Sequence, residues 1–414
     1  MRHRTVLVFV GLIALLGAAA VFAIAPAAGG DLTVRWISDT SRDNQFNHHA
    51  IGVGPQGQVI VAPVLAVSGN ANLTPTSCTL VRLAPETGTV RWRTTTPPNK
   101  CFVHALSQPA IADIDGDSHL EVAVSTTEHA LIVYDARTGH EEFRIPLSSY
   151  GYGQPTVGNL LPVPGPELVT SDINGGVVVT YGNGTVAWRY NLSSSVWDSP
   201  VVADVDGDNA PEVLIQTGTG PVLFSANGTV EWRHNMSALG NGVATAQADD
   251  DQALEVFVTA TNTVQAFDGA TGTVQWEQEL FGTPNLKSIR DGDGDGTPEL
   301  YIGVSDGTVR ALSAATGHTE WTTEVIPTKG ENLPAPVLGD VNNDGQPEVV
   351  AVTGDGTVVV LDARSGAELA TYKRDVPIWT YPTLAEIDSD AAREILIRYG
   401  DGRVVALEYT TELL

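Results

Sequence analysis

The sequence predicts an all-β fold, an eight-bladed β-propeller of four-stranded blades. Three observations support this prediction: a nine-residue acidic segment recurs along the chain, a turn that leads into an aromatic residue recurs between its copies, and no segment of the repeats shows sustained helical periodicity. Units of about 40–50 residues that contain four short strands are typical of propeller blades.

The acidic segment reads DIDGDSHLE at residues 113–121, and close copies begin at residues 204, 291 and 340. Carboxylates or amides occupy its positions 1, 3 and 5, and a Glu occupies position 9. Weaker copies begin at Gln247 and Glu386, and the copy at 159–167 keeps only Glu167. Alternating short acids allow one tight turn to supply most of the roughly six to eight oxygens that Ca²⁺ prefers. The segment therefore indicates a cation-binding loop as well as a repeat.

The second motif is a turn containing Gly that leads into an aromatic anchor residue. Short apolar runs such as EVAVST and VVVLDA lie between the two motifs, and Gly, Asn and Asp separate these runs. We expect each Gly to form the turn and each Trp to pack between neighbouring blades. The anchors lie 44 to 51 residues apart, at Trp92, Phe143, Trp188, Trp232, Trp276, Trp321 and, in the last copy, Ala370.

The number of units predicts how the ring closes. Seven units with an acidic segment run from residue 109 to 409, and a degenerate unit at 52–92 precedes them. The last unit ends one strand short, and the N-terminal segment DLTVRW can supply that strand, with Trp36 as its anchor. We therefore predict that residues 31–38 pair in the last blade, which leaves no bare sheet edge. The predicted propeller spans 31–409, and 410–414 form a tail.

The composition excludes two classes of protein. The formal net charge is −27, with 49 Asp and Glu against 22 Lys and Arg, so the chain is a poor partner for nucleic acid. Hydrophobic residues make up 42% of the chain, which argues against a disordered protein. The acidic surface with scarce Lys resembles exported proteins of salt-loving microbes, in which charge keeps the fold soluble.

Residues 1–30 differ from the repeats. Arg2 and Arg4 precede an apolar run from Val6 to Ala25, which is about long enough to span a bilayer. We favour a transmembrane signal anchor over a cleaved signal peptide, for which small residues at 23–28 would offer cleavage sites. In either case, the charged end stays inside and the repeats leave the cytoplasm. The protein is then anchored in the cell membrane, or secreted if the helix is cleaved.

The acidic segments resemble the FG-GAP/VCBS repeats of integrin-type propellers, in which such loops bind calcium. The turns before Trp resemble the pyrroloquinoline-quinone-like repeats of quinoprotein dehydrogenases and of non-enzymatic outer-membrane assembly propellers. Both resemblances together cover nearly all of residues 31–409, and they specify fold better than function.

The resemblance to FG-GAP repeats implies several structural Ca²⁺ sites, with the backbone carbonyl of His119 as an added ligand in the first. Four acids within nine residues also repel each other strongly unless a cation lies among them. The implied ligand sets are Asp113, Asp115, Asp117 and Glu121; Asp204, Asp206, Asp208 and Glu212; Asp291, Asp293, Asp295 and Glu299; and Asp340, Asn342, Asp344 and Glu348.

The connections from the outer strand of one blade to the inner strand of the next should gather around the channel, on the face opposite the acidic segments. Trp197, Trp379 and Tyr152 each lie three residues before a Pro that opens an inner strand, and we place all four Lys in these connections. Such side chains around a concave mouth suggest a site for a sugar or an anionic group. The alternative is that they only plug the channel and pack the loops. The candidate ligand-binding residues are Tyr150, Tyr152, Trp197, Asp198, Lys287, Lys329, Trp379, Tyr381, His48 and His49.

No catalytic residue can be assigned from the sequence. In an exported chain, Cys78 and Cys101 are expected to form a disulfide. The absence of vicinal cysteines argues against a quinone (PQQ)-dependent dehydrogenase, which remains an alternative. A calcium-containing polysaccharide lyase is another, with His48, His49, Arg42 or Lys329 as its base. We predict a non-catalytic, membrane-tethered, calcium-stabilised scaffold that binds a protein or a cell-surface glycan.

Overall fold

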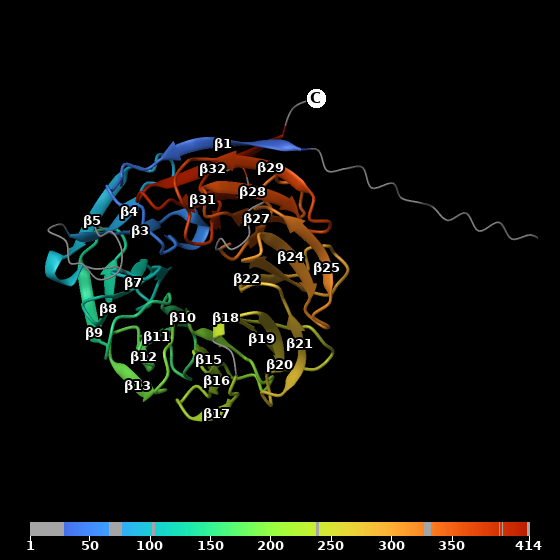
Figure 1. Cartoon of the computed structure of the whole chain (residues 1–414). Helices are drawn as coiled ribbons and strands as arrows, with labels where there is room; N and C mark the ends of the chain where they lie inside the picture. Colours follow the sequence, from blue (N-terminus) through green and yellow to red (C-terminus); the bar gives the residue numbers. More distant parts are fainter. Residues whose placement is uncertain are drawn as a thin grey trace, which may run out of the picture.

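The computed structural model describes residues 29–65, 77–101, 104–236, 240–326, 333–388, 390 and 392–411. These residues form eight four-stranded antiparallel sheets that surround a central opening (Figure 1). The predicted all-β, eight-bladed propeller is thereby confirmed. The described part contains two short 3-10 helices, η1 (Pro55–Gly57) and η2 (Pro98–Lys100).

Blades 1 to 7 each consist of four consecutive strands, ordered from the channel outwards. Blades 1 to 4 contain β2 (Gly52–Val53), β3 (Ile60–Val64), β4 (Cys78–Leu83) and β5 (Val90–Thr96); β6 (Ala110–Ala112), β7 (Glu121–Thr126), β8 (Ala130–Asp135) and β9 (Glu141–Pro146); β10 (Thr156–Gly158), β11 (Glu167–Ser171), β12 (Gly176–Tyr181) and β13 (Val186–Asn191); and β14 (Val201–Ala203), β15 (Glu212–Thr217), β16 (Gly220–Phe224) and β17 (Val230–Arg233).

Blades 5 to 7 contain β18 (Gly240–Ala246), β19 (Glu255–Ala260), β20 (Thr263–Asp268) and β21 (Val274–Glu279); β22 (Pro284–Arg290), β23 (Glu299–Val304), β24 (Thr308–Ser313) and β25 (Thr319–Glu324); and β26 (Val337–Gly339), β27 (Glu348–Val352), β28 (Thr357–Asp362) and β29 (Glu368–Lys373). Blade 8 takes its first three strands from the C-terminal part of the chain, as β30 (Thr383–Ala385), β31 (Glu394–Arg398) and β32 (Val404–Thr411).

The N-terminal strand β1 (Gly30–Ile37) completes blade 8 by pairing antiparallel with β32, which confirms the predicted closure (Figure 1). β32 runs to Thr411, two residues past the predicted end of the propeller. The register shifts between Val34 and Trp36, so Arg35 lies in a β-bulge. The predicted N-terminal helix lies outside the described residues. Within the described part of the chain, no helix is long and apolar enough to cross a membrane.

Neighbouring blades bury their middle strands between them. The side chains of β7, β15, β19 and β23 are buried along their whole length, because each of these strands has a neighbouring blade on both faces. The outer strands β21 and β25 instead alternate between half-buried and exposed positions. Eight hydrophobic clusters result, and each spans one interface between adjacent blades.

The repeat tryptophans connect adjacent blades, as predicted. Trp232 in blade 4 donates its indole N–H to the Gly269 carbonyl in blade 5, at 2.7 Å. Its ring lies against Gly272, where φ is +66° and a Cβ would approach the ring to 2.7 Å, so only Gly suits this turn. The same bond, at 2.7–2.9 Å, joins Trp36 to Pro85, Trp92 to Ala136, Trp188 to Ala226, Trp276 to Ala314 and Trp321 to Ala363.

Candidate binding site at the channel mouth and candidate metal loops

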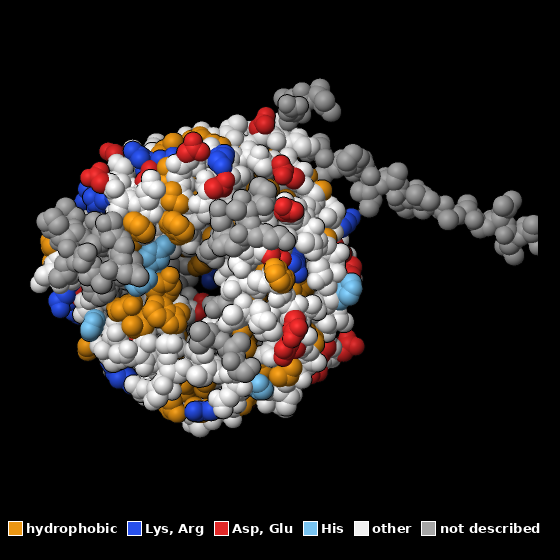
Figure 2. Space-filling view, in the orientation of Figure 1, with side chains coloured by type: hydrophobic (Ala, Val, Ile, Leu, Met, Phe, Trp, Pro, Cys, Tyr) orange, Lys and Arg blue, Asp and Glu red, His pale blue; other side chains and the backbone are white. Residues whose placement is uncertain are grey.

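The connections between blades form a cavity of about 220 Å³ at one mouth of the channel. Figure 2 shows hydrophobic side chains and histidines gathered on one side of the central opening. The fold brings together residues from connections that are more than 300 positions apart in the chain. Eight of the ten predicted ligand-binding residues line this cavity: His48, His49, Tyr152, Trp197, Asp198, Lys287, Trp379 and Tyr381.

The other two predicted residues do not line it. The ring of Tyr150 stacks on that of His104, with centroids 5.8 Å apart, and Lys329 lies outside the described residues. The placement of all four Lys in the connections is wrong. Lys287 belongs to the inner strand β22, and Lys373 ends the outer strand β29, where its Nζ lies 2.5 Å from an Asp355 oxygen.

Two tryptophans at the cavity are exposed. Trp197 and Trp379 are 44% and 40% exposed, whereas Trp36, one of the repeat anchors, is 7% exposed. The Trp379 indole N–H donates to the Gln45 carbonyl at 2.6 Å, which fixes the ring at the cavity rim. The Trp197 ring meets that of Tyr152 edge-on, with centroids 5.4 Å apart. Both indoles therefore present aromatic surface to solvent beside the cavity.

An acidic side chain, Asp198, and a basic side chain, Lys287, also line the cavity. Burial raises the pKa of Asp198, while its carboxylate accepts the backbone N–H groups of Ser199 at 2.7 Å and Val243 at 2.9 Å. The Nζ of Lys287 lies 4.9 Å from the centroid of the Tyr381 ring, an arrangement for a cation–π interaction. The lining therefore offers donors, acceptors and aromatic faces within one small volume.

Some lining residues were missed from the sequence, although a local signal existed. Gln108, Gln154 and Ser199 each precede a Pro at the start of an inner strand, as the predicted Tyr381 does. They also link the inner strands around the channel: the Gln108 side-chain amide donates to the Ile51 carbonyl at 3.1 Å, and that of Gln154 to the Pro109 carbonyl at 2.8 Å. His104 does not line the cavity, and it was missed as well, although it lies in the connection between blades 1 and 2.

The acidic segments form the turns between first and second strands. Three of the predicted ligand sets bring acids together, and so does the weak copy at 247–255, where oxygens of Asp249, Asp251 and Glu255 lie within 4.8 Å of one another. In the loop at 291–299, oxygens of all four predicted ligands lie within 4.8 Å of one another. In the loops at 113–121 and 204–212, three of the four do so, namely Asp113, Asp115 and Glu121, and Asp204, Asp206 and Glu212. Asp117 and Asp208 accept backbone N–H groups of their own loops, from His119 at 2.8 Å and Ala210 at 2.7 Å.

The Glu at position 9 has a second role that the sequence did not reveal. One of its oxygens accepts the backbone N–H of position 2, which closes the loop; in the loop without acids, Leu160 still donates to Glu167 at 2.8 Å. The Glu is therefore a structural residue even where no metal is expected. The same bond, at 2.5–2.9 Å, is made by Glu121, Glu212, Glu255, Glu299, Glu348 and Glu394.

Burial and the neighbouring carboxylates raise the pKa of this Glu. The pKa of Glu299 rises to about 7, chiefly because of burial, and its Oε1 is buried without a hydrogen-bond partner among the described residues. A cation among the acids would remove both penalties, so these residues fit a bound Ca²⁺. The pKa also rises to about 7 at Glu121, Glu212 and Glu348.

Two other loops have hydrogen-bond donors of the chain itself among their acids. The side-chain amide of Asn342 donates to Asp344 at 3.2 Å and to Glu348 at 2.8 Å, so it lies between two of the predicted ligands. In the weak copy at 386–394, the guanidinium of Arg35 contacts Asp388 and lies 2.9 Å from Glu394. The bulge in β1 is where Arg35 leaves the strand register and meets this loop.

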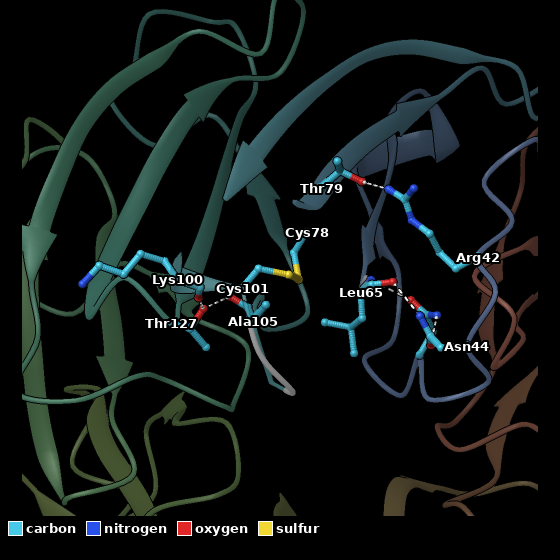
Figure 3. Close-up of a disulfide and its surroundings, with 10 residues drawn as sticks. Arg42, Asn44, Leu65, Cys78, Thr79, Lys100, Cys101, Ala105 and Thr127 are labelled. Atoms are coloured by element: carbon cyan, nitrogen blue, oxygen red, sulfur yellow. Dashed lines mark hydrogen bonds between the residues drawn. A yellow bond between two sulfur atoms is a disulfide. The ribbon is translucent and has the colours of Figure 1, made fainter. Parts of the chain in front are cut away.

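The predicted disulfide is present. Cys78 and Cys101 are bonded, with their Cα atoms 5.4 Å apart (Figure 3). The bond ties the connection between blades 1 and 2 to the start of β4. The Thr127 hydroxyl also donates to the Lys100 carbonyl at 2.5 Å, which joins this connection to the end of β7 in blade 2.

Comparison with known proteins agrees with the repeat assignments. Residues 291–351 match the FG-GAP-like repeat, and residues 76–210 match the family described as outer membrane protein assembly factor BamB. No curated protein matches the sequence significantly. Each family match covers less than half of the chain.

Solved structures show the same fold at low identity. BamB from Moraxella catarrhalis has a TM-score of 0.61 at 16% identity, over 92% of this chain and 99% of that one. The computationally designed Ika8 protein has a TM-score of 0.64 at 16% identity, over 91% and 99%. Quinohemoprotein alcohol dehydrogenase from Comamonas testosteroni has a TM-score of 0.62 at 12% identity, over 91% of this chain and 76% of that one. An assembly factor and an enzyme share this fold, so the structural similarity indicates the fold and not the function.

Proposed function

We propose that this protein is a non-catalytic, calcium-stabilised propeller that binds a cell-surface glycan at its channel mouth. The observation that carries the proposal is the pair of exposed indoles, Trp197 and Trp379, beside a cavity with polar groups. The apolar C–H faces of a sugar ring pack on such surfaces, while hydroxyl groups need the donors and acceptors that Asp198 and Lys287 provide.

The size of the cavity indicates that only a small part of the ligand would enter it. Its volume of about 220 Å³ is below the roughly 300–1,000 Å³ of pockets that enclose drug-sized ligands. One sugar unit at the end of a longer polymer suits such a cavity, and the exposed indoles on its rim extend the contact. A protein partner that inserts one polar side chain is the second possibility, and the experiment below separates the two.

Calcium is the structural part of the proposal. The loops at 113–121, 204–212 and 291–299 would each hold one Ca²⁺ between the first two strands of a blade. Their clustered oxygens support this assignment. We do not extend it to the loop at 386–394, because the Arg35 guanidinium already neutralises that loop.

The proposed location is outside the cytoplasm, at the membrane. The Cys78–Cys101 disulfide suits an oxidising compartment. The apolar segment at 6–25 would act as the anchor. The match to the assembly-factor family over residues 76–210 is consistent with a protein that works at the cell envelope.

The test is binding of the full-length protein to purified envelope polysaccharide, measured by cosedimentation and calorimetry. Trp197→Ala and Trp379→Ala should each weaken binding, and the double variant should abolish it. Phe281→Ala is the matched control, because Phe281 is 79% exposed but does not line the cavity. Melting curves should show that all variants remain folded.

Equal binding by all variants would reject the channel mouth as the site. If the wild type ignores polysaccharide but retains an envelope protein that the double variant loses, the site is right and the ligand class is wrong.

A further inference from the structure

Three histidines converge beside the cavity from two different connections. His48 and His49 come from the connection between blades 8 and 1, and His104 from the connection between blades 1 and 2. A ring nitrogen of each lies within 4.8 Å of one from each of the others. The ring centroids are 4.4 Å apart for His48 and His49, and 4.9 Å apart for His48 and His104.

Hydrogen bonds set the orientation of these rings. The Nδ1 of His48 lies 2.7 Å from the Phe46 carbonyl, which accepts its proton. The Nε2 of His48 therefore carries a lone pair and accepts the Nδ1–H of His104 at 2.9 Å, so a metal bound there would replace this proton. A ligating His typically has its other ring nitrogen fixed by a carbonyl in this way.

His49 is the second, independent indication. It is only 6% exposed, and its Nε2 is buried without a hydrogen-bond partner among the described residues. An unsatisfied buried nitrogen costs about 1–3 kcal/mol, so a group that it could bind would stabilise the site.

The surroundings keep the three rings uncharged. Burial lowers the pKa of His48 and His49, and it lowers that of His104 to about 4. The buried Arg398 guanidinium repels a proton on His48 and His49 further. Neutral imidazole is the form that ligates metals. Arg398 also opposes a metal cation, so metal binding at this site has to exceed that repulsion.

We propose that His48, His49 and His104 form a binding site for a divalent transition metal, with Zn²⁺ as the expected ion. Zn–N bonds of about 2.0–2.1 Å in a tetrahedral site place ligand nitrogens about 3.3 Å apart. The 2.9 Å between His48 and His104 would therefore open by a few tenths of an ångström. His48 and His49 also line the cavity, whereas His104 does not, so a metal held by the three rings would lie beside the cavity.

The acidic loops could also bind added metal. Adding Co²⁺ in the presence of excess Ca²⁺ distinguishes binding at the histidines from binding at these loops. Tetrahedral nitrogen-rich Co²⁺ absorbs visible light strongly, whereas octahedral oxygen-bound Co²⁺ absorbs weakly. The full-length protein, purified without a polyhistidine tag, should develop the strong band with one equivalent of Co²⁺. Zn²⁺ should remove the band and raise the melting temperature.

His104→Gln and His49→Gln should lose the band and the thermal shift. His140→Gln is the matched control, because His140 is exposed on a turn of blade 2 that faces away from the channel mouth. If His49→Gln does not fold, His104→Gln, at a partly exposed position, decides. The proposal is overturned if the wild type shows no strong band, or if folded His104→Gln retains it. No glycan is present in this assay, so its outcome does not depend on the proposed function.

Discussion

Replacing Glu299 by Gln should have opposite effects on stability with and without calcium. The burial that raises the pKa of Glu299 from its ordinary value of 4.5 to about 7 penalises its charged form in the folded protein. A raised carboxyl pKa contributes stability at pH below 4.5, and this contribution is lost as the pH rises through 7. At pH 8 and without metal, the ionised Glu299 therefore destabilises the fold.

The size of this effect follows from the pKa difference. The difference between a pKa of 4.5 and one of about 7 corresponds to at most about 3.4 kcal/mol, and solvent that reaches the loop reduces this to about 1–2 kcal/mol. Gln is isosteric and uncharged, and its carbonyl can still accept the Gly292 N–H, which now lies 2.9 Å from Glu299. In chelator at pH 8, Glu299→Gln should therefore be more stable than wild type by about 1–2 kcal/mol.

With bound Ca²⁺, the order should reverse, because Gln removes one anionic ligand and weakens the metal site. The assay is denaturant unfolding of wild type and Glu299→Gln at pH 5, 6, 7 and 8, in chelator and in saturating Ca²⁺. Glu167→Gln is the control, since its loop has lost the other acids and should not respond to Ca²⁺. An effect of Glu299→Gln that keeps the same sign in both conditions would refute the reasoning.

Three further predictions concern closure and packing. Trp232→Phe removes the inter-blade indole hydrogen bond and part of the ring that packs on Gly272, and it should cost about 2–3 kcal/mol in denaturant unfolding. Arg35→Gln removes the cationic partner of buried Glu394 and should cost about 1–3 kcal/mol in chelator, because Arg35 itself is partly exposed; Ca²⁺ should restore part of this loss in melting curves. Reduction of the Cys78–Cys101 disulfide, which closes a loop with a sequence separation of 23, should cost about 3 kcal/mol, measured by unfolding with and without reductant.

The sequence alone determined the architecture. The number of blades, the closing strand and the inter-blade role of Trp232 and its equivalents followed from patterns that repeat about every 45 residues. Such patterns are local, because a strand, a turn glycine and an acidic loop each depend on residues close together in the chain. The cavity residues Trp197 and Trp379 were also predictable, since their position before an inner strand places them at the channel.

Only the tertiary structure decided which residues meet. Arg35 lies more than 350 residues from the loop that it neutralises, and a bulge in β1, not a motif, brings it there. His104 joins His48 across two connections of different sequence, so no spacing indicates the trio. Contacts between distant segments are fixed by how the blades close, and one chain's sequence carries no local record of them.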